Sequence, residues 1–205
     1  MRTLSLAVVV CLASASDVFA ACAPARMLRI VTAIEAPGVP PDHFASQPKT
    51  VYRFGNKYGR VEEVLNRQTN THLLVIVSEP DVWMVNRVNM NGQHMVDRGP
   101  SLDFRAPVLT SSKSEFWKDL EFGCEEAFMK KAGAKPENLA DGQTRYTHTA
   151  EGIKATLLVG PKKRPERLEA ESSEGRFAVK YLTYEDTDFQ PGLFARPDGV
   201  RLSER

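Results

Sequence analysis

Short apolar-rich runs alternate with turn residues along most of the chain, a pattern typical of antiparallel strands. The clearest example is residues 73–97, where the apolar run LLVIV is followed by a Pro80-Asp81 turn and by VWMVNRVNM. Further strands are expected in LRIVTAIEA, on both sides of the GNKYG turn at residues 55–59, and in the segments TRYTHTA, IKATLLVG, ERLEAES and RFAVKYLTYE. The pattern predicts about nine strands.

The Asn91-Gly92 dipeptide is the strongest short hairpin signal in the chain, because both central positions of a type I′ turn need positive φ. A two-residue turn at this point fixes the pairing of the flanking strands. It predicts that Val88 faces Met95, which would place both apolar side chains on one face of the sheet.

One helix is expected to interrupt the strands. Its start is marked by a capping-box pattern at Ser112 and Glu115, and its end by Gly133 and Pro136. An apolar stripe runs between them, with a kink expected at Gly123; the stripe consists of Trp117, Leu120, Cys124 and Phe128.

These elements predict a mainly β protein of the α+β type. A flat sheet of this size would leave long edges and an uncovered face. The expected fold is therefore a strongly curved antiparallel sheet, or an incomplete β-barrel, with one substantial helix packed on or in it.

The amino-terminal segment has the features of a secretory signal peptide. Arg2 precedes the apolar run at residues 4–13, which is too short to span a bilayer as a helix. Val18 and Ala20 stand at the −3 and −1 positions for cleavage after Ala20. The expected mature protein is a single domain, residues 21–205, and no second apolar run reaches membrane-spanning length.

Two roles are open for Cys22, which follows the expected cleavage site. It could bear a lipid, although Phe19 stands where a lipoprotein signal usually has Leu and Asp17 interrupts the apolar run. It could instead pair with Cys124, because Cys11 would leave with the signal peptide. Such a disulfide closes a loop of about 100 residues and stabilises by at most about 4.7 kcal/mol. The predicted location is periplasmic or secreted, or lipid-anchored through Cys22.

Composition and motifs give little sign of catalysis. The formal net charge is +1, which argues against a dedicated nucleic-acid-binding protein. The four histidines show no metal-binding spacing, and there is no GxSxG or phosphate-binding loop. His94 and Asp97 would lie on opposite faces of one strand. We therefore expect no enzyme, no metal and no cofactor.

Three segments resemble the bacterial outer-membrane lipoprotein carrier superfamily (LolA/LolB-like). They are the aromatic-Arg-aromatic triplet Tyr52-Arg53-Phe54, the strand-turn-strand LLVIVSEPDVWMVN, and FAVKYLTYED followed by LFARPDGVRL. The resemblance implies an open barrel whose helices cover an apolar cavity that holds acyl chains. It also implies that Arg53 helps to hold the lid helices closed, so that Arg53→Leu alters ligand release with little loss of folding.

Apolar and aromatic residues recur on one parity of several strands. If these alternate residues share one face of the sheet, they line a cavity beneath the helix. Otherwise they are ordinary core residues. The candidate cavity residues are Tyr52, Arg53, Phe54, Val75, Val77, Trp83, Val85, Trp117, Leu120, Phe128, Phe177, Val179 and Tyr181.

Three functions follow from the sequence. The favoured one is non-catalytic binding or carrying of a hydrophobic ligand, such as a lipid or an acyl chain. The second is an envelope accessory protein that acts through a protein partner and has no ligand cavity. The third is a hydrolase.

Overall fold

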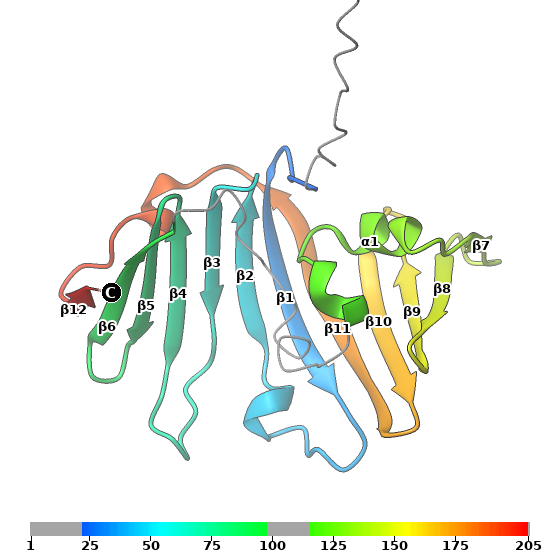
Figure 1. The fold of residues 1–205 in the computed structure, drawn as a ribbon, viewed down its shortest axis with the longest axis horizontal. Helices are drawn as coiled ribbons and strands as arrows, with labels where there is room; N and C mark the ends of the chain where they lie inside the picture. Colours follow the sequence, from blue (N-terminus) through cyan, green and yellow to red (C-terminus); the bar gives the residue numbers. More distant parts are fainter. Residues whose placement is uncertain (1–21, 98–114, 205) are drawn as a thin grey trace, which may run out of the picture.

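The computed structural model describes residues 22–97 and 115–204. In these residues twelve strands form one sheet in the order β12-β6-β5-β4-β3-β2-β1-β11-β10-β9-β8-β7 (Figure 1). The strands are β1 (Met27–Glu35), β2 (Lys49–Phe54), β3 (Tyr58–Glu62), β4 (Leu73–Ser78), β5 (Asp81–Asn86), β6 (Asn91–Val96), β7 (Pro136–Asn138), β8 (Thr144–Ala150), β9 (Ile153–Val159), β10 (Pro165–Ser172), β11 (Gly175–Thr187) and β12 (Arg201–Glu204).

The sheet is curved and unclosed, because β12 and β7 lie at its two ends and do not pair with each other. Neighbouring strands are antiparallel except for β12 and β6, which are parallel. The predicted number of about nine strands was too low. β7 and β12 have three and four residues, which is too few for an alternating pattern to stand out in the sequence.

The two halves of the sheet join where β1 pairs with β11. This pairing connects the beginning of the described chain to its carboxyl-terminal part, with a bulge between Val31 and Thr32. β2 to β6 extend as successive hairpins on one side of β1, and β10 to β7 extend on the other side of β11. A turn with a cis Glu79-Pro80 peptide joins β4 to β5, at the predicted position.

Short helices replace the single predicted helix. Around the predicted stripe, a 3-10 helix η2 (Glu115–Asp119) precedes α1 (Glu125–Lys131), which has only seven residues. Gly123 lies between them with a φ of +86°, a left-handed conformation that ends a helix rather than bending it. α1 ends before Gly133, as predicted. The other helices are η1 (Phe44–Ser46) and η3 (Pro191–Phe194).

The predicted two-residue turn at Asn91-Gly92 was wrong. Asn86 pairs with Asn91 and Val85 with Gly92, so residues 87–90 form the turn. Gly92 is a strand residue, and a Cβ at this position would lie 2.5 Å from the backbone oxygen of Met84. The absence of a side chain at Gly92 therefore permits the close approach of β5 and β6, and Gly92 does not form the turn.

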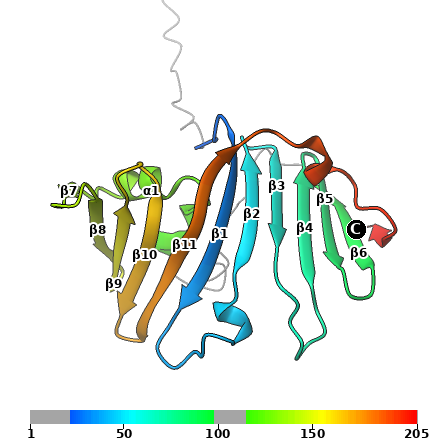
Figure 2. The same cartoon turned by 180° about the vertical axis from the view of Figure 1, so that it is seen from behind.

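The two faces of the sheet carry separate cores, and α1 and η3 lie on opposite faces (Figures 1 and 2). We call the face that contacts η2 and α1 the helical face, and the one that contacts η3 the C-terminal face. The helical core contains Leu28, Ile30, Val51, Trp117, Leu120, Phe128, Leu157, Leu168 and Val179. The C-terminal core contains Met27, Leu74, Ile76, Trp83, Val85 and Phe194.

Some sequence predictions concern segments outside the described residues. The signal peptide, its cleavage after Ala20, and Ser112 of the capping box all belong to them. Among the residues that are described, no helix has the length and apolar character needed to cross a membrane.

Candidate functional site

The predicted disulfide joins Cys22 to Cys124, with a Cα–Cα distance of 5.8 Å. Cys124 is the residue that precedes α1, so the bond fixes the beginning of the described chain to the amino-terminal end of this helix. A sulfur in a disulfide cannot also form the thioether of a lipid anchor. Of the two roles that the sequence left open, Cys22 in this structure therefore has that of a disulfide partner.

Arg53 fastens the sheet to the segment that precedes α1. Its side chain extends from β2 and is only 1% exposed. One terminal nitrogen donates to the Phe122 carbonyl at 2.6 Å, and the other donates to the Cys22 carbonyl at 2.7 Å and the Glu121 carboxylate at 2.6 Å. Nε donates to the Gly55 carbonyl at 3.2 Å. One guanidinium thus holds together β2, the disulfide-bonded end and the residues before α1.

Glu125 begins α1 and is buried in the helical core. Its carboxylate accepts hydrogen bonds from the Gly123 amide at 3.1 Å, the Tyr181 hydroxyl at 3.1 Å and the Tyr184 hydroxyl at 3.4 Å. Burial raises the pKa of Glu125. Hydrogen bonds from the backbone amides of Glu125 and Gly123 and from the Tyr181 hydroxyl, together with the charge of Arg53, partly oppose the rise. The same burial, next to this carboxylate, raises the pKa of both tyrosines.

This raised pKa predicts that burial of Glu125 makes the fold less stable as the pH increases. Because the folded state binds the Glu125 proton more tightly than the unfolded state, the free energy of unfolding decreases as the pH rises through the folded-state pKa. Glu125→Gln keeps an oxygen acceptor but carries no charge. We expect this variant to gain stability over the native protein at pH 8 and little at pH 4, as measured by urea denaturation.

Glu126 provides a matched control with the opposite sign. Although burial opposes it, hydrogen bonds from Lys130 and Tyr146 lower the pKa of Glu126. Glu126→Gln should therefore lose stability at pH 8, where the native carboxylate is charged and paired. If Glu125→Gln has the same pH dependence as the native protein, the buried Glu125 does not contribute to it.

The candidate cavity residues do not share one face. Nine belong to or contact the helical face: Arg53, Val75, Val77, Trp117, Leu120, Phe128, Phe177, Val179 and Tyr181. Four others belong to the core of the C-terminal face or pack against it: Tyr52, Phe54, Trp83 and Val85. Successive strand residues point to opposite faces, so Tyr52 and Phe54 lie on the face opposite to Arg53.

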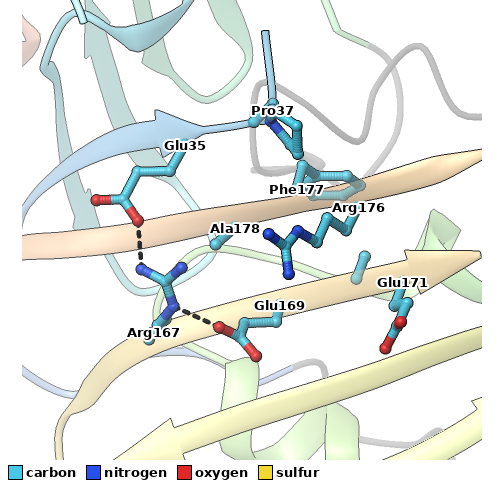
Figure 3. Close-up of a pocket in the computed structure, with 10 residues that line it drawn as sticks. Glu35, Pro37, Arg167, Glu169, Glu171, Arg176, Phe177 and Ala178 are labelled. Carbon is cyan, nitrogen blue, oxygen red and sulfur yellow. Dashed lines mark hydrogen bonds and ion pairs between the residues drawn. The ribbon is translucent and has the colours of Figure 1, made fainter. Parts of the chain in front are cut away.

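A polar pocket of about 430 Å³ lies where the end of β1 meets β10 and β11 (Figure 3). Arg167 in this pocket contacts the carboxylates of Glu35 at 2.5 Å and Glu169 at 2.6 Å. Of the candidate cavity residues, only Phe177 lines it. Its central arginine is already neutralised by two carboxylates, so this pocket is a poor site for an apolar ligand.

His94 lies between two carboxylates on the C-terminal face. Its ring nitrogens contact Asp81 at 2.8 Å and Glu204 at 2.6 Å, and its ring stacks on Trp83. These hydrogen bonds, first that to Asp81 and then that to Glu204, raise the pKa of His94. Glu204 belongs to β12, far from His94 in the chain, so no local pattern indicates that the two meet; the contact fixes the last strand to β6.

An apolar strip crosses β3 to β6 on the helical face. Val61 faces Val75, which faces Met84 on the next strand, and Val82 faces Met95. These residues are half-buried, except for Met84, which is 38% exposed. The apolar strip consists of Val61, Leu73, Val75, Val82, Met84 and Met95. It borders the helical core, because Val61, Val75 and Val82 pack against that core.

Lys49 lies at the β2 end of this region. It shares the helical face with Val51 and is 5% exposed. Its ammonium lies 4.5 Å above the centre of the Phe44 ring. Neither Lys49 nor most of the strip could be recognised from the sequence, because single residues on several strands form no local pattern.

Comparisons with known proteins leave the family open. No protein-family model matches the chain, and no curated protein matches it. Among solved structures, an uncharacterized conserved protein from Thermus thermophilus has 14% identity and a TM-score of 0.49, with 88% of this chain and 91% of that chain covered. PNGF-II has 8% identity and a TM-score of 0.34, with 88% and 32% covered.

A third structure is described as a "putative outer membrane lipoprotein-sorting protein domain" from Vibrio parahaemolyticus. It has 13% identity and a TM-score of 0.32, with 83% of this chain and 87% of that chain covered. All three scores are below 0.5, so we draw nothing about the function of this chain from them. Among the described residues, no group of three His, Cys, Asp or Glu side chains could hold a metal ion.

Proposed function

We propose that this protein binds a hydrophobic ligand, such as a lipid or an acyl chain, on the helical face of its sheet and does no chemistry on it. The observation that carries the proposal is the apolar strip across β3 to β6. Soluble proteins expose few contiguous apolar patches, and those that persist commonly mark binding sites. Each methylene that a ligand buries there would contribute about 0.8 kcal/mol.

The arrangement of the covering helices supports this location. α1 contacts β8 and β9, on the opposite side of β1 from the strip. On the half of the helical face that bears the strip, Val61, Val75 and Val82 pack against the helical core. A ligand on the strip would therefore extend an apolar core that already exists.

Two polar clusters that lie away from the apolar strip also favour a binding role over a catalytic one. Glu125 is occupied by three hydrogen-bond donors, and both ring nitrogens of His94 are occupied by carboxylates. The disulfide is consistent with an oxidising compartment outside the cytoplasm. We therefore propose a periplasmic or secreted binding protein.

The test measures binding of N-phenyl-1-naphthylamine, an uncharged fluorescent probe, to the mature protein. Met84→Lys places a charge in the strip and should weaken binding about tenfold or more, because it removes the contact of one large apolar side chain. Val88→Lys is the matched control: Val88 is 40% exposed but lies in the turn between β5 and β6, and its replacement should leave binding unchanged.

Lipid extraction and native mass spectrometry of protein purified from its host give an independent readout. We expect a bound apolar molecule that is lost in the Met84→Lys variant. A native protein that binds no probe and contains no extractable lipid would overturn the proposed function.

A further inference from the structure

We propose that the ligand of the apolar strip is a single-chain amphiphile with a carboxylate headgroup, and that Lys49 binds this headgroup. The inference rests on the proposed function, because it assumes that the strip holds the acyl chain. It adds the chemical class of the ligand and the residue that recognises it.

Lys49 is a buried cation that the charge of Glu63 reaches without forming a direct ion pair. Its side chain is only 5% exposed, and no hydrogen bond or ion pair of its ammonium is found within residues 22–97 and 115–204; the Phe44 ring provides the one cation–π contact. A buried charge is costly unless it is paired and hydrogen-bonded. A carboxylate would supply the ion pair and the hydrogen bonds together.

The position of Lys49 fits a headgroup at the end of an acyl chain. Alternation along β2 places Lys49 on the same face as Val51. The β2–β3 pairing ends at Thr50 and Glu62, and the next residue, Glu63, is close enough for its charge to act on Lys49. Glu63 in turn donates its backbone amide to Leu73, which belongs to the apolar strip. From β2 to β6 the face spans about 19 Å, four strand spacings, along which an acyl chain could lie.

The charges around Lys49 favour a carboxylate over a phosphate. Glu63, the residue that follows β3, is the acidic group whose charge acts on Lys49. Thr32 of β1 pairs with Lys49 on the other side, and Phe44 of η1 covers its ammonium. A carboxylate adds one negative charge and leaves the cluster with a net charge of −1. A phosphate monoester carries about −1.5 to −2 at neutral pH and would be repelled more strongly by Glu63.

The experiment displaces N-phenyl-1-naphthylamine from the mature protein with palmitate, methyl palmitate or hexadecyl phosphate. The native protein should bind palmitate about tenfold or more tightly than the ester, as expected for one charge-assisted hydrogen bond, and also more tightly than the phosphate. Lys49→Met should abolish the preference for palmitate, whereas Lys49→Arg should retain it. Lys154→Met, an exposed lysine of β9, is the matched control and should behave as the native protein does.

The outcomes separate this inference from the proposed function. Equal affinity for palmitate and its methyl ester, or a preference that survives in Lys49→Met, would overturn the role of Lys49 while leaving a hydrophobic site. Tighter binding of hexadecyl phosphate would overturn the carboxylate assignment. Failure of the native protein to bind the probe and all three ligands would overturn the proposed function itself. The comparison of acid and ester in the native protein holds even if Lys49→Met does not fold.

Discussion

An Arg53→Leu variant is expected to lose about 3–5 kcal/mol of unfolding free energy, a cost typical of removing one partner from a buried ion pair. The replacement leaves the carbonyls of Phe122 and Cys22 without their donor, and the Glu121 carboxylate without its cation. Leucine can fill part of the space but donates no hydrogen bond. Urea denaturation followed by circular dichroism measures the loss.

This expectation differs from the one implied by the resemblance to lipoprotein carriers, in which Arg53→Leu changes ligand release and spares the fold. The reason is the number of groups that share the guanidinium, since four acceptors from three segments of the chain depend on it. Arg29→Leu is the matched control, because Arg29 is also a strand arginine paired with a glutamate but its side chain is 39% exposed. It should cost less than about 1 kcal/mol. Equal effects of the two substitutions would contradict the anchoring role of Arg53.

Reduction of the Cys22–Cys124 disulfide is expected to lower the free energy of unfolding by up to about 4.7 kcal/mol. The bond joins residues 102 positions apart, so the unfolded chain gains much conformational freedom when it is cut. The measurement is urea denaturation with and without dithiothreitol. The double variant Cys22→Ala/Cys124→Ala should match the reduced native protein and should not respond to dithiothreitol.

The disulfide and Arg53 should not act independently. Arg53 donates to the carbonyl of Cys22, and the disulfide holds that carbonyl in place. The loss in the triple variant should therefore be smaller than the sum of the separate losses, by about 0.5–3 kcal/mol for residues in contact. Strict additivity would show that the bond and the guanidinium stabilise different parts of the molecule. A reduced protein as stable as the oxidised one would contradict the structural role of the disulfide.

Several features were visible in the sequence because they depend on neighbouring residues. The Pro80 turn follows from a residue whose φ is fixed, and the end of α1 before Gly133 follows from a residue that can adopt positive φ. The pairing of Cys22 with Cys124 followed from counting, since the expected mature chain contains no third cysteine. The strand-rich fold followed from alternation, although β7 and β12 were too short to be recognised.

The candidate site could be predicted only in part. Parity along a strand shows which residues share a face of that strand, but it does not show which face of one strand continues on the next. Tyr52 and Trp83 thus belong to a different core from Val77 and Val179. Gly92 was misread for a related reason: its closest neighbour is the Met84 backbone across the β5–β6 pair, and this contact exists only in the folded sheet.

The sequence by itself determined the strand-rich character of the chain, the available disulfide and the approximate end of the helix, because propensity, alternation and cysteine count are local or compositional properties. The tertiary structure alone decided that β1 pairs with β11, that Arg53 binds the carbonyls of Phe122 and Cys22, and that Lys49 is buried at the end of an apolar strip. These features depend on the register between distant strands, which is set by how two cores pack on opposite faces of one sheet.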